Sequence, residues 1–208
     1  MEARRSLPPR APRLPATGGT AARFVAMIDF SCNHFELFGL APRFAVDAAA
    51  LDAAWRARQS DVHPDRHAGG DAAQKRLALQ ASARVNEAYR TVRDPVARAE
   101  YLLALHGVDA TRESDTALPF DFLERQLERR ERADDAAAAR DSGALAALRD
   151  ELQRDAAALE AEVATLLDER GAYAEARTPV RELRFLAKVG EDLRELEGRL
   201  DDATIEER

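Results

Sequence analysis

Apolar residues recur along most of the chain at the spacing of an amphipathic α-helix. The first long pattern covers residues 47–62, and its apolar stripe consists of Leu51, Trp55 and Val62. Asp47 is a predicted N-cap for this helix, because its carboxylate can accept the free backbone amides of the first turn. Arg58 falls in the middle of the stripe, and we expect its aliphatic stem to cover apolar surface while its head reaches water.

A second long pattern follows Asp71, which is a predicted cap for the next helix. Its apolar residues lie three or four positions apart: Leu77, Ala81, Val85, Ala88 and Val92. Pro64 ends the preceding helix, since proline lacks a backbone amide and pushes the residue before it toward extended geometry. The two helices are therefore predicted to pack as an antiparallel hairpin whose loop projects at one end.

Shorter helical stretches flank this hairpin. One lies within NHFELFGL and ends at Gly39. Another, VARAEYLLALHG, follows Asp94-Pro95 and ends at Gly107.

Three further helical patterns follow a polar linker at 108–118. The second and third carry narrow apolar stripes, formed by Leu145, Leu148, Leu152, Leu159, Val163 and Leu166 and by Leu186, Val189, Leu193, Leu196 and Leu200. The sequence thus predicts an all-α protein. A helical unit built on the hairpin would cover 27–107, and an elongated three-helix bundle would cover 119–208.

The first helix of this bundle, at 119–140, separates its charges by sign. Glu124, Glu128, Glu131 and Asp135 share the face of Leu127, whereas Arg125, Arg129 and Arg132 take another face. A solvated helix stabilised by pairs four residues apart explains most such charge runs. Leucine among carboxylates fits that explanation less well.

Composition and charge exclude several classes of protein. The net charge is −7, and residues 113–208 carry 15 basic and 26 acidic groups, so no basic face for a nucleic acid is expected. No apolar run approaches the roughly 20 residues that span a bilayer. The single cysteine, Cys32, cannot form an internal disulfide, which favours a reducing compartment.

Residues 1–26 form a leader with four prolines and five arginines, which we expect to be disordered and without function. Met27 is then a plausible start. A mitochondrial transit peptide is the alternative, because the leader is rich in Arg and poor in acids.

The loop sequence HPDRH points to recognition rather than catalysis. His63 and His67 stand four apart, but Pro64 prevents the helix that would bring both rings to one metal ion, and no HExxH pattern or cysteine pair completes a site. No nucleophile elbow or phosphate loop is present in the sequence. Asp65 could instead accept a charge-assisted hydrogen bond from an Arg or Lys of a partner, beside a His63 ring able to donate and accept.

HFELFGL, an amphipathic helix, HPDRH, NEAYRTVRDP and RAEYLLALHG occur in this order. They resemble a J-domain, and specifically that of the HscB family of iron-sulfur cluster co-chaperones. The similarity continues through DFLERQLERRE and VRELRFL, so that it covers roughly residues 28–200.

The resemblance implies a chain that is not an enzyme and needs no cofactor or metal. The loop residues His63, Pro64 and Asp65, with Arg56 and Arg66, would dock on an ATP-bound DnaK-like chaperone (HscA in bacteria) and favour ATP hydrolysis. The bundle would deliver the cluster scaffold IscU. The family's scaffold-binding residues correspond here to Leu123, Leu127, Glu128, Glu131, Asp135 and Phe185.

The sequence departs from the family pattern in three places. Ser60 and Asp61 stand where a basic residue commonly precedes the HPD, Glu124 replaces an apolar residue, and Pro179 interrupts the start of the last helix. The N-terminal CxxC zinc module of some eukaryotic relatives is absent from the sequence.

A general J-type co-chaperone for other clients remains the alternative function, with a metalloenzyme a distant third. The bacterial cytoplasm is the expected location, and the mitochondrial matrix is the alternative.

Overall fold

The computed structural model describes residues 32–62, 72–110 and 118–206, with side chains described as far as Leu200. All regular elements in these ranges are helices, which confirms the predicted all-α fold. In chain order they are α2 (His34–Leu37), α3 (Ala48–Val62), α4 (Ala72–Arg93), α5 (Pro95–Leu105), α6 (Phe120–Ala138), α7 (Ser142–Ala164), the π-helix η2 (Thr165–Glu169) and α8 (Tyr173–Glu206).

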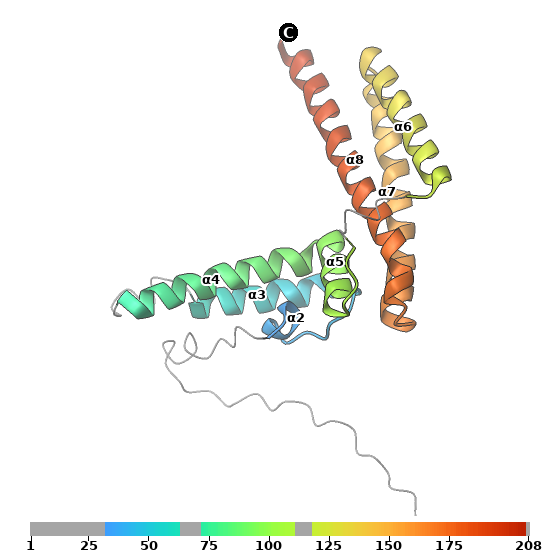
Figure 1. Ribbon diagram of the computed structural model, residues 1–208. Coiled ribbons are helices and arrows are strands. Elements are labelled where there is room, and N and C mark those ends of the chain that lie inside the picture. Colours follow the sequence, from blue (N-terminus) through green and yellow to red (C-terminus); the bar gives the residue numbers. More distant parts are fainter. Residues whose placement is uncertain (1–31, 63–71, 111–117, 207–208) are drawn as a thin grey trace, which may run out of the picture.

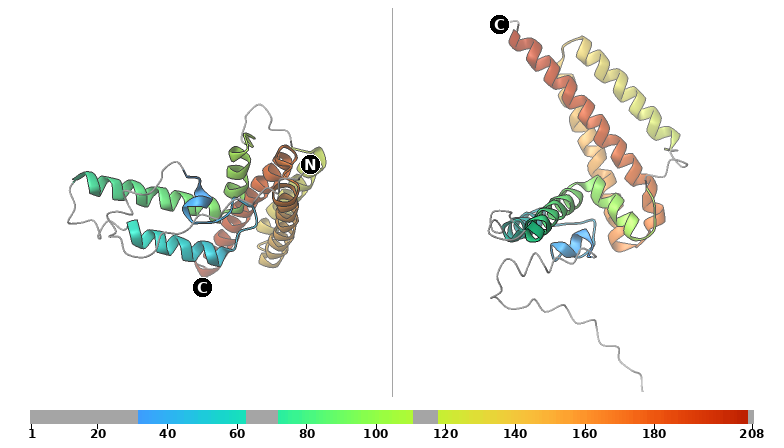
Figure 2. Two further views of the ribbon diagram at one scale, coloured as in Figure 1. Left: turned by 90° about the horizontal axis from the view of Figure 1, so that it is seen from below. Right: turned by 60° about the vertical axis from the view of Figure 1, so that its left-hand side comes forward.

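The helices form two groups that meet at α5. α3 and α4 lie side by side as a hairpin that points away from α6, α7 and α8 (Figure 1). α5 packs against both α4 and α8, and the other views show the hairpin and the three long helices from the side and from below (Figure 2). The hairpin and the bundle are thus two arms joined at one end of each.

Local sequence signals set the helix ends. The Asp47 carboxylate accepts hydrogen bonds from the amides of Ala49 and Ala50 at 2.9 and 3.1 Å, as predicted. Asp94 caps α5 through the amide of Ala97 at 2.8 Å, with proline in the first helical position that follows. The predicted cap Asp71 lies outside the described residues.

Glycine ends α2 and α5 as the sequence predicts. Gly39 and Gly107 have φ angles of 69° and 74°, which lie in the left-handed region where a side chain would strain the backbone. Their amides bond back to the carbonyls of Glu36 and Ala104. Each helix therefore stops where the chain must turn.

One continuous apolar core spans the junction of the two arms. It combines residues of the hairpin region, such as Phe44, Val85 and Leu103, with Val163, Leu166, Leu167, Ala176 and Val180 from the end of α7, η2 and the start of α8. The linker predicted at 108–118 begins inside this contact, because Ala110 is buried. A second core, farther along the bundle, is formed by Phe122, Ala133, Ala136, Leu145, Leu148, Leu152, Leu186 and Leu193.

Two side chains differ from the expectations of the sequence. The head of Arg58 donates a hydrogen bond from Nε to the carbonyl of Leu37 at 2.9 Å, so it ties α3 to the end of α2 and does not simply reach into water. Pro179 lies within α8, which begins six residues earlier at Tyr173 and continues past it to Glu206.

Candidate functional site

The predicted chaperone site falls between the two helices of the hairpin arm. α3 ends at Val62 and α4 begins at Ala72, and the predicted chaperone-binding residues His63, Pro64, Asp65 and Arg66 between them lie outside the described residues. The fifth predicted residue, Arg56, is exposed on α3. The described part therefore places the flanks of the loop at the end remote from α5 (Figure 1).

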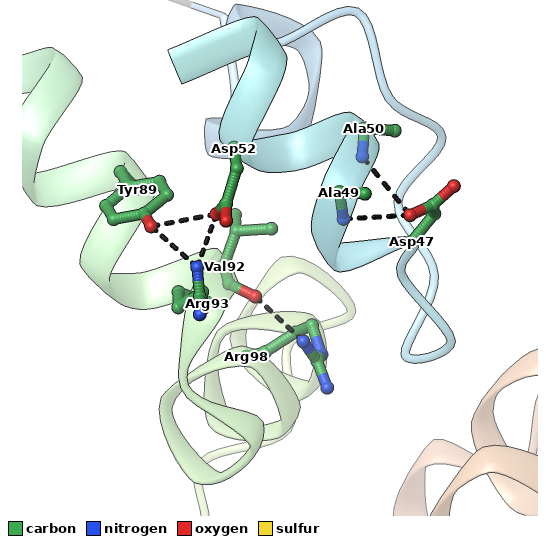
Figure 3. A network of polar contacts seen from close by, with 8 residues as sticks. All are labelled: Asp47, Ala49, Ala50, Asp52, Tyr89, Val92, Arg93 and Arg98. Carbon is green, nitrogen blue, oxygen red and sulfur yellow. Dashed lines mark hydrogen bonds and ion pairs between the residues drawn. The ribbon is translucent and has the colours of Figure 1, made fainter. Parts of the chain in front are cut away.

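Polar contacts between α3 and α4 hold this arm together. The hydroxyl of Tyr89 donates to Asp52 at 2.9 Å, and Arg93 pairs with the same carboxylate and bonds to the Tyr89 hydroxyl (Figure 3). The Tyr89 hydrogen bond and the Arg93 guanidinium outweigh partial burial and lower the pKa of Asp52. Asp52 therefore stays ionised and links the two helices near their base.

A second set of contacts lies farther along the hairpin. Trp55 stacks on Tyr89 with ring centres 4.6 Å apart, and its Nε1 donates to the Asn86 side chain at 3.3 Å. Gln59 also donates to Asn86, at 2.5 Å. These contacts restrict sliding of α3 on α4 and so stiffen the arm toward the loop.

The bundle carries an apolar groove between α6 and α8. Its volume is about 570 Å³, and Leu123, Leu127 and Phe185 are among its lining residues. Their exposed fractions are 42%, 60% and 36%, which are high for large apolar side chains. Phe185 also meets the buried ring of Phe122 edge-on at 5.6 Å, so the core supports it from behind. Pro179 therefore does not displace Phe185 from α6.

The predicted acidic residues lie beside this groove rather than in it. Glu128 lines a neighbouring depression of about 420 Å³ between α6 and α7, and Glu131 and Asp135 are exposed along the outside of α6. The charged lining of the groove is mixed: Arg129, Arg130, Lys188 and Arg199 with Asp134, Asp192 and Glu195. The structure thus brings the three apolar residues together and separates them from the acids by part of a helical turn.

Chains of similar sequence and structure are co-chaperones. The Co-chaperone protein HscB homolog of Bordetella pertussis is 49% identical over 161 residues, which are 77% of this chain and 94% of the relative. The HSCB C-terminal oligomerisation domain family matches residues 118–194. This chain belongs to the HscB co-chaperone family.

Solved HscB structures share the fold. The chaperone HscB from Vibrio cholerae superposes with a TM-score of 0.73 at 32% identity, over 81% of this chain and 99% of that one. Human co-chaperone protein HscB gives a TM-score of 0.74 at 25% identity, over 80% of this chain and 82% of that one. The predicted J-domain followed by a helical C-terminal domain is therefore confirmed.

Arg129 is a buried structural residue of the HscB bundle, a role that its charge conceals in the sequence. Its side chain is only 2% exposed, and it bonds to Gln126 at 2.5 Å, Glu151 at 3.1 Å and Asp155 at 2.5 Å. The signal was present, because position 129 continues the buried row of α6: Phe122, Gln126, Ala133 and Ala136. The explanation of this charge run as a solvated helix therefore does not hold for Arg129, which is buried.

The depression that contains Glu128 also holds a carboxyl group of α8 whose pKa is raised. Burial raises the pKa of Glu182, the charge of Glu162 raises it further, and Arg125 opposes both. All three residues line the depression that contains Glu128. This part of the HscB bundle therefore gathers carboxyl groups of α6, α7 and α8 beside the apolar groove.

The described residues contain no group of three or more potential metal ligands. None of their helices is long and apolar enough to cross a membrane. The histidines of HPDRH lie outside this search.

Proposed function

We propose that this HscB-family chain is an adaptor with two partners and no enzymatic activity of its own. The hairpin arm stimulates the ATPase of a DnaK-like (HscA-type) chaperone, and the bundle delivers an IscU-type iron-sulfur scaffold. The observation that supports this best is the exposed apolar set of Leu123, Leu127 and Phe185, held on a different arm from the HPD sequence. The bacterial cytoplasm is the location that fits, with the mitochondrial matrix as the alternative.

The chaperone arm acts by presenting charge between two helices that hold each other in place. Asp65 supplies a carboxylate for an Arg or Lys of the chaperone, and the exposed Arg56 adds positive charge on the same arm. The contacts of Asp52 and Asn86 with both helices limit motion of the loop flanks. Ordered flanks lose less conformational entropy on docking than mobile ones.

The scaffold surface acts through an apolar centre and an acidic flank. Leu127 has the exposure, and Phe185 both the exposure and the support from the core, expected of anchors that fit into pockets of a partner. Glu128, Glu131 and Asp135 lie alongside and would attract a basic partner, which mainly affects association rate and salt dependence. A scaffold with apolar residues next to lysines or arginines fits this surface.

The test of the chaperone arm is the Asp65→Asn variant, which keeps size and removes charge. Stimulation of an HscA-type ATPase should collapse while helicity and melting stay nearly unchanged. The matched control Asp61→Asn changes a neighbouring carboxylate outside the HPD and should not lose stimulation. Full stimulation by the Asp65→Asn protein would refute the assignment.

The test of the scaffold surface is the Leu127→Ala/Phe185→Ala double variant, studied by titration calorimetry with an IscU-type scaffold. Binding should weaken by about 1 to 3 kcal/mol for each residue that is a central anchor. Leu105→Ala is a matched control, because this leucine is 41% exposed on α5 and does not line the groove. Unchanged affinity in a folded double variant would place the client site elsewhere.

The alternative function is a general J-type co-chaperone for other clients. Such a protein would stimulate the chaperone equally with an IscU-type scaffold and with an unrelated unfolded client. The adaptor should instead show added stimulation only with the scaffold. Metal analysis of the purified protein tests the remaining metalloenzyme hypothesis.

A further inference from the structure

The helix that leads into the junction of the two arms ends in an irregular turn. α7 changes at Thr165 into the π-helix η2, and the amide of Arg170 bonds to the carbonyl of Thr165 at 3.1 Å, five residues back. A π turn holds one more residue than an α turn, so it rotates the side chains that follow it. Such turns often occur at functional positions. The residue of interest in this turn is Asp168.

Asp168 binds two consecutive backbone amides of the other arm. Its Oδ1 accepts from Phe44 at 2.7 Å and its Oδ2 accepts from Ala45 at 2.8 Å. Both amides belong to the loop between α2 and α3, just before the Asp47 cap. The bonds are charge-assisted, and together they use both carboxylate oxygens, so they fix direction as well as distance. We refer to this contact as the Asp168 clamp.

The Asp168 clamp lies at the edge of a buried region: its bond to the Phe44 amide is partly buried, whereas Ala45 is exposed. The Phe44 side chain is 4% exposed and belongs to the core that spans the junction. The guanidinium of Arg98 lies 4.9 Å from the centre of the Phe44 ring and donates to the carbonyl of Val92 at 2.9 Å. Asp168 and Glu160 both interact with this cation electrostatically. Water therefore competes less well for the Phe44 amide than for the exposed Ala45 amide.

A separate attachment joins α5 and the chain after it to α8. His106 stacks on Tyr173 with ring centres 3.6 Å apart, and Arg184 pairs with Glu100 at 3.3 Å. Arg181 donates to the carbonyl of Ala110 at 3.1 Å. One attachment would leave the hairpin free to swing about α5, whereas a second attachment at Phe44 and Ala45 restricts that swing.

The length of the hairpin makes a small swing important. α4 has 22 residues. At 1.5 Å per residue a helix of this size is about 33 Å long, so a tilt of about 10° at its base moves its far end by roughly 6 Å. A displacement of this size is larger than the tolerance of a hydrogen bond. Orientation at the base therefore decides where the loop flanks lie relative to the groove on the bundle.

We infer that Asp168 is a positioning residue that fixes the hairpin arm relative to the α6–α8 groove, so that a protein bound in the groove is presented to the partner of the HPD loop. The functional part of this inference rests on the proposed function. The orienting part rests only on the two hydrogen bonds and the shared core, and it can be tested without either partner.

The structural test compares the chain with Asp168→Ala, with Glu169→Ala as a matched control at the exposed neighbouring carboxylate of the same turn. Hydrogen exchange of the Phe44 and Ala45 amides should accelerate by roughly tenfold or more when their charged acceptor is lost. Asp168→Asn keeps the size and one carbonyl oxygen and should protect only one of the two amides. Unchanged exchange in both variants would overturn the clamp.

The orientation test uses spin labels at the exposed residues Gln80 on α4 and Arg154 on α7, in a background with Cys32→Ser. The distribution of distances between the labels should broaden in Asp168→Ala and remain narrow in Glu169→Ala. A distribution that stays narrow in Asp168→Ala would show that α5 alone fixes the arm, which contradicts the inference.

The functional test measures the ATPase of an HscA-type chaperone with and without an IscU-type scaffold. Asp168→Ala should bind the scaffold in calorimetry and stimulate the chaperone alone like the unchanged protein, but it should lose several-fold of the added stimulation that the scaffold provides. Full added stimulation despite a broadened distance distribution would overturn the positioning role. Absence of scaffold binding by the unchanged protein would instead refute the proposed function and leave the clamp measurements valid.

Discussion

The hairpin and the bundle are both made of long amphipathic helices, but their interiors differ in side-chain size. The buried face of α4 consists of Ala78, Ala81, Val85, Ala88 and Val92. The buried faces of α7 and α8 are mainly leucine, for example Leu145, Leu148, Leu186 and Leu193. Because helix spacing depends on the side chains at the contact, the small residues favour a close and stiff pair, whereas the leucines need a third helix to cover them.

The two arms also differ in how they treat their apolar surface. The hairpin covers its largest side chain, Trp55, by stacking it on Tyr89. The bundle leaves Leu123, Leu127 and Phe185 exposed together in one groove. Scattered exposed residues such as Leu79 are ordinary on a protein surface, but a grouped set marks an interaction site. The comparison shows one arm built to hold a shape and the other built to leave a surface open.

Truncation of core side chains should give the largest difference in unfolding between the two arms. Leu103 and Leu145 are both fully buried, the first in the core at the junction and the second in the core of the bundle. Each Leu→Ala change should cost about 2 to 5 kcal/mol of unfolding free energy. Trp55 is the only tryptophan, so its fluorescence reports on the hairpin while circular dichroism reports on all helices.

Leu103→Ala should lower both transitions in urea together, because its core contains side chains from both arms. Leu145→Ala should lower the circular dichroism transition more than the fluorescence transition. If Leu103→Ala shifts the fluorescence alone, the junction is not a shared core in solution.

The sequence was most informative where helix periodicity and capping decide the structure. The Asp47 cap, the glycine ends at Gly39 and Gly107, and the buried row from Ala81 to Val92 follow from local physical chemistry, because each depends on residues within one or two turns. The family followed from HPDRH and DFLERQLERRE, and the comparisons confirm it. The assignment of individual site residues stays a prediction.

The sequence was least informative about contacts between distant segments. Asp168 and Phe44 are 124 residues apart, and nothing local to Asp168 indicates that its carboxylate would reach those amides. Arg129 shows a related limit: its charge is typical of a solvated face, but the residue falls on the buried row of α6. Tertiary ion pairs on α7 override the preference of a lone arginine for water.

Removal of the buried arginine should weaken the bundle more than the hairpin. Arg129→Met should lower the unfolding free energy by about 1 to 3 kcal/mol, because it leaves the Gln126 side-chain oxygen buried without its donor. The partners Glu151 and Asp155 are 34% and 45% exposed, so water can solvate them and limit the loss.

Two variants sharpen this prediction in urea unfolding. Arg129→Met/Gln126→Leu should regain part of the loss, since an apolar pair needs no hydrogen bonds. Arg132→Met removes an exposed partner of the same Glu151 and should change stability by about 0.5 kcal/mol or less. Equal losses in Arg129→Met and Arg132→Met would contradict a special role of burial.

Removal of a helix N-cap should have a smaller effect on the unfolding free energy than core truncation, and each arm has a cap that can be compared. Asp47 caps α3 in the hairpin, and Asp141 caps α7 in the bundle through the amide of Ala144 at 2.9 Å. Replacement of either by Ala should lower the unfolding free energy by about 0.5 to 2 kcal/mol, while Asp47→Asn should retain most of the stability. We expect the larger loss at Asp47, because its carboxylate serves two amides. The midpoint in urea at constant slope measures the difference, and a larger loss at Asp141 would reverse the ranking.

The smallest effects should appear as opposite pH dependences of the two arms. Burial lowers the pKa of His34 below its ordinary 6.5, Arg84 lowers it further, and Glu87 opposes both. The unfolded chain then takes up a proton more readily than the folded one, so the contribution of His34 is complete above pH 6.5 and is lost as pH falls below that value. His34→Phe keeps a ring to stack on Tyr101, at present 4.2 Å away, and should flatten stability across this range.

Glu182 in the bundle should show the reverse sign. Burial, reinforced by Glu162, raises its pKa above the ordinary 4.5, so the folded chain holds the proton more tightly than the unfolded chain. Its contribution is complete below pH 4.5 and is lost as pH rises through its folded pKa. Glu182→Gln should therefore stabilise the protein at neutral pH. It should not change the loss of stability that His34 causes as the pH falls. Urea midpoints from pH 4 to 8 for both variants measure the two slopes, and slopes of the same sign would mean that one of these side chains has different surroundings in solution.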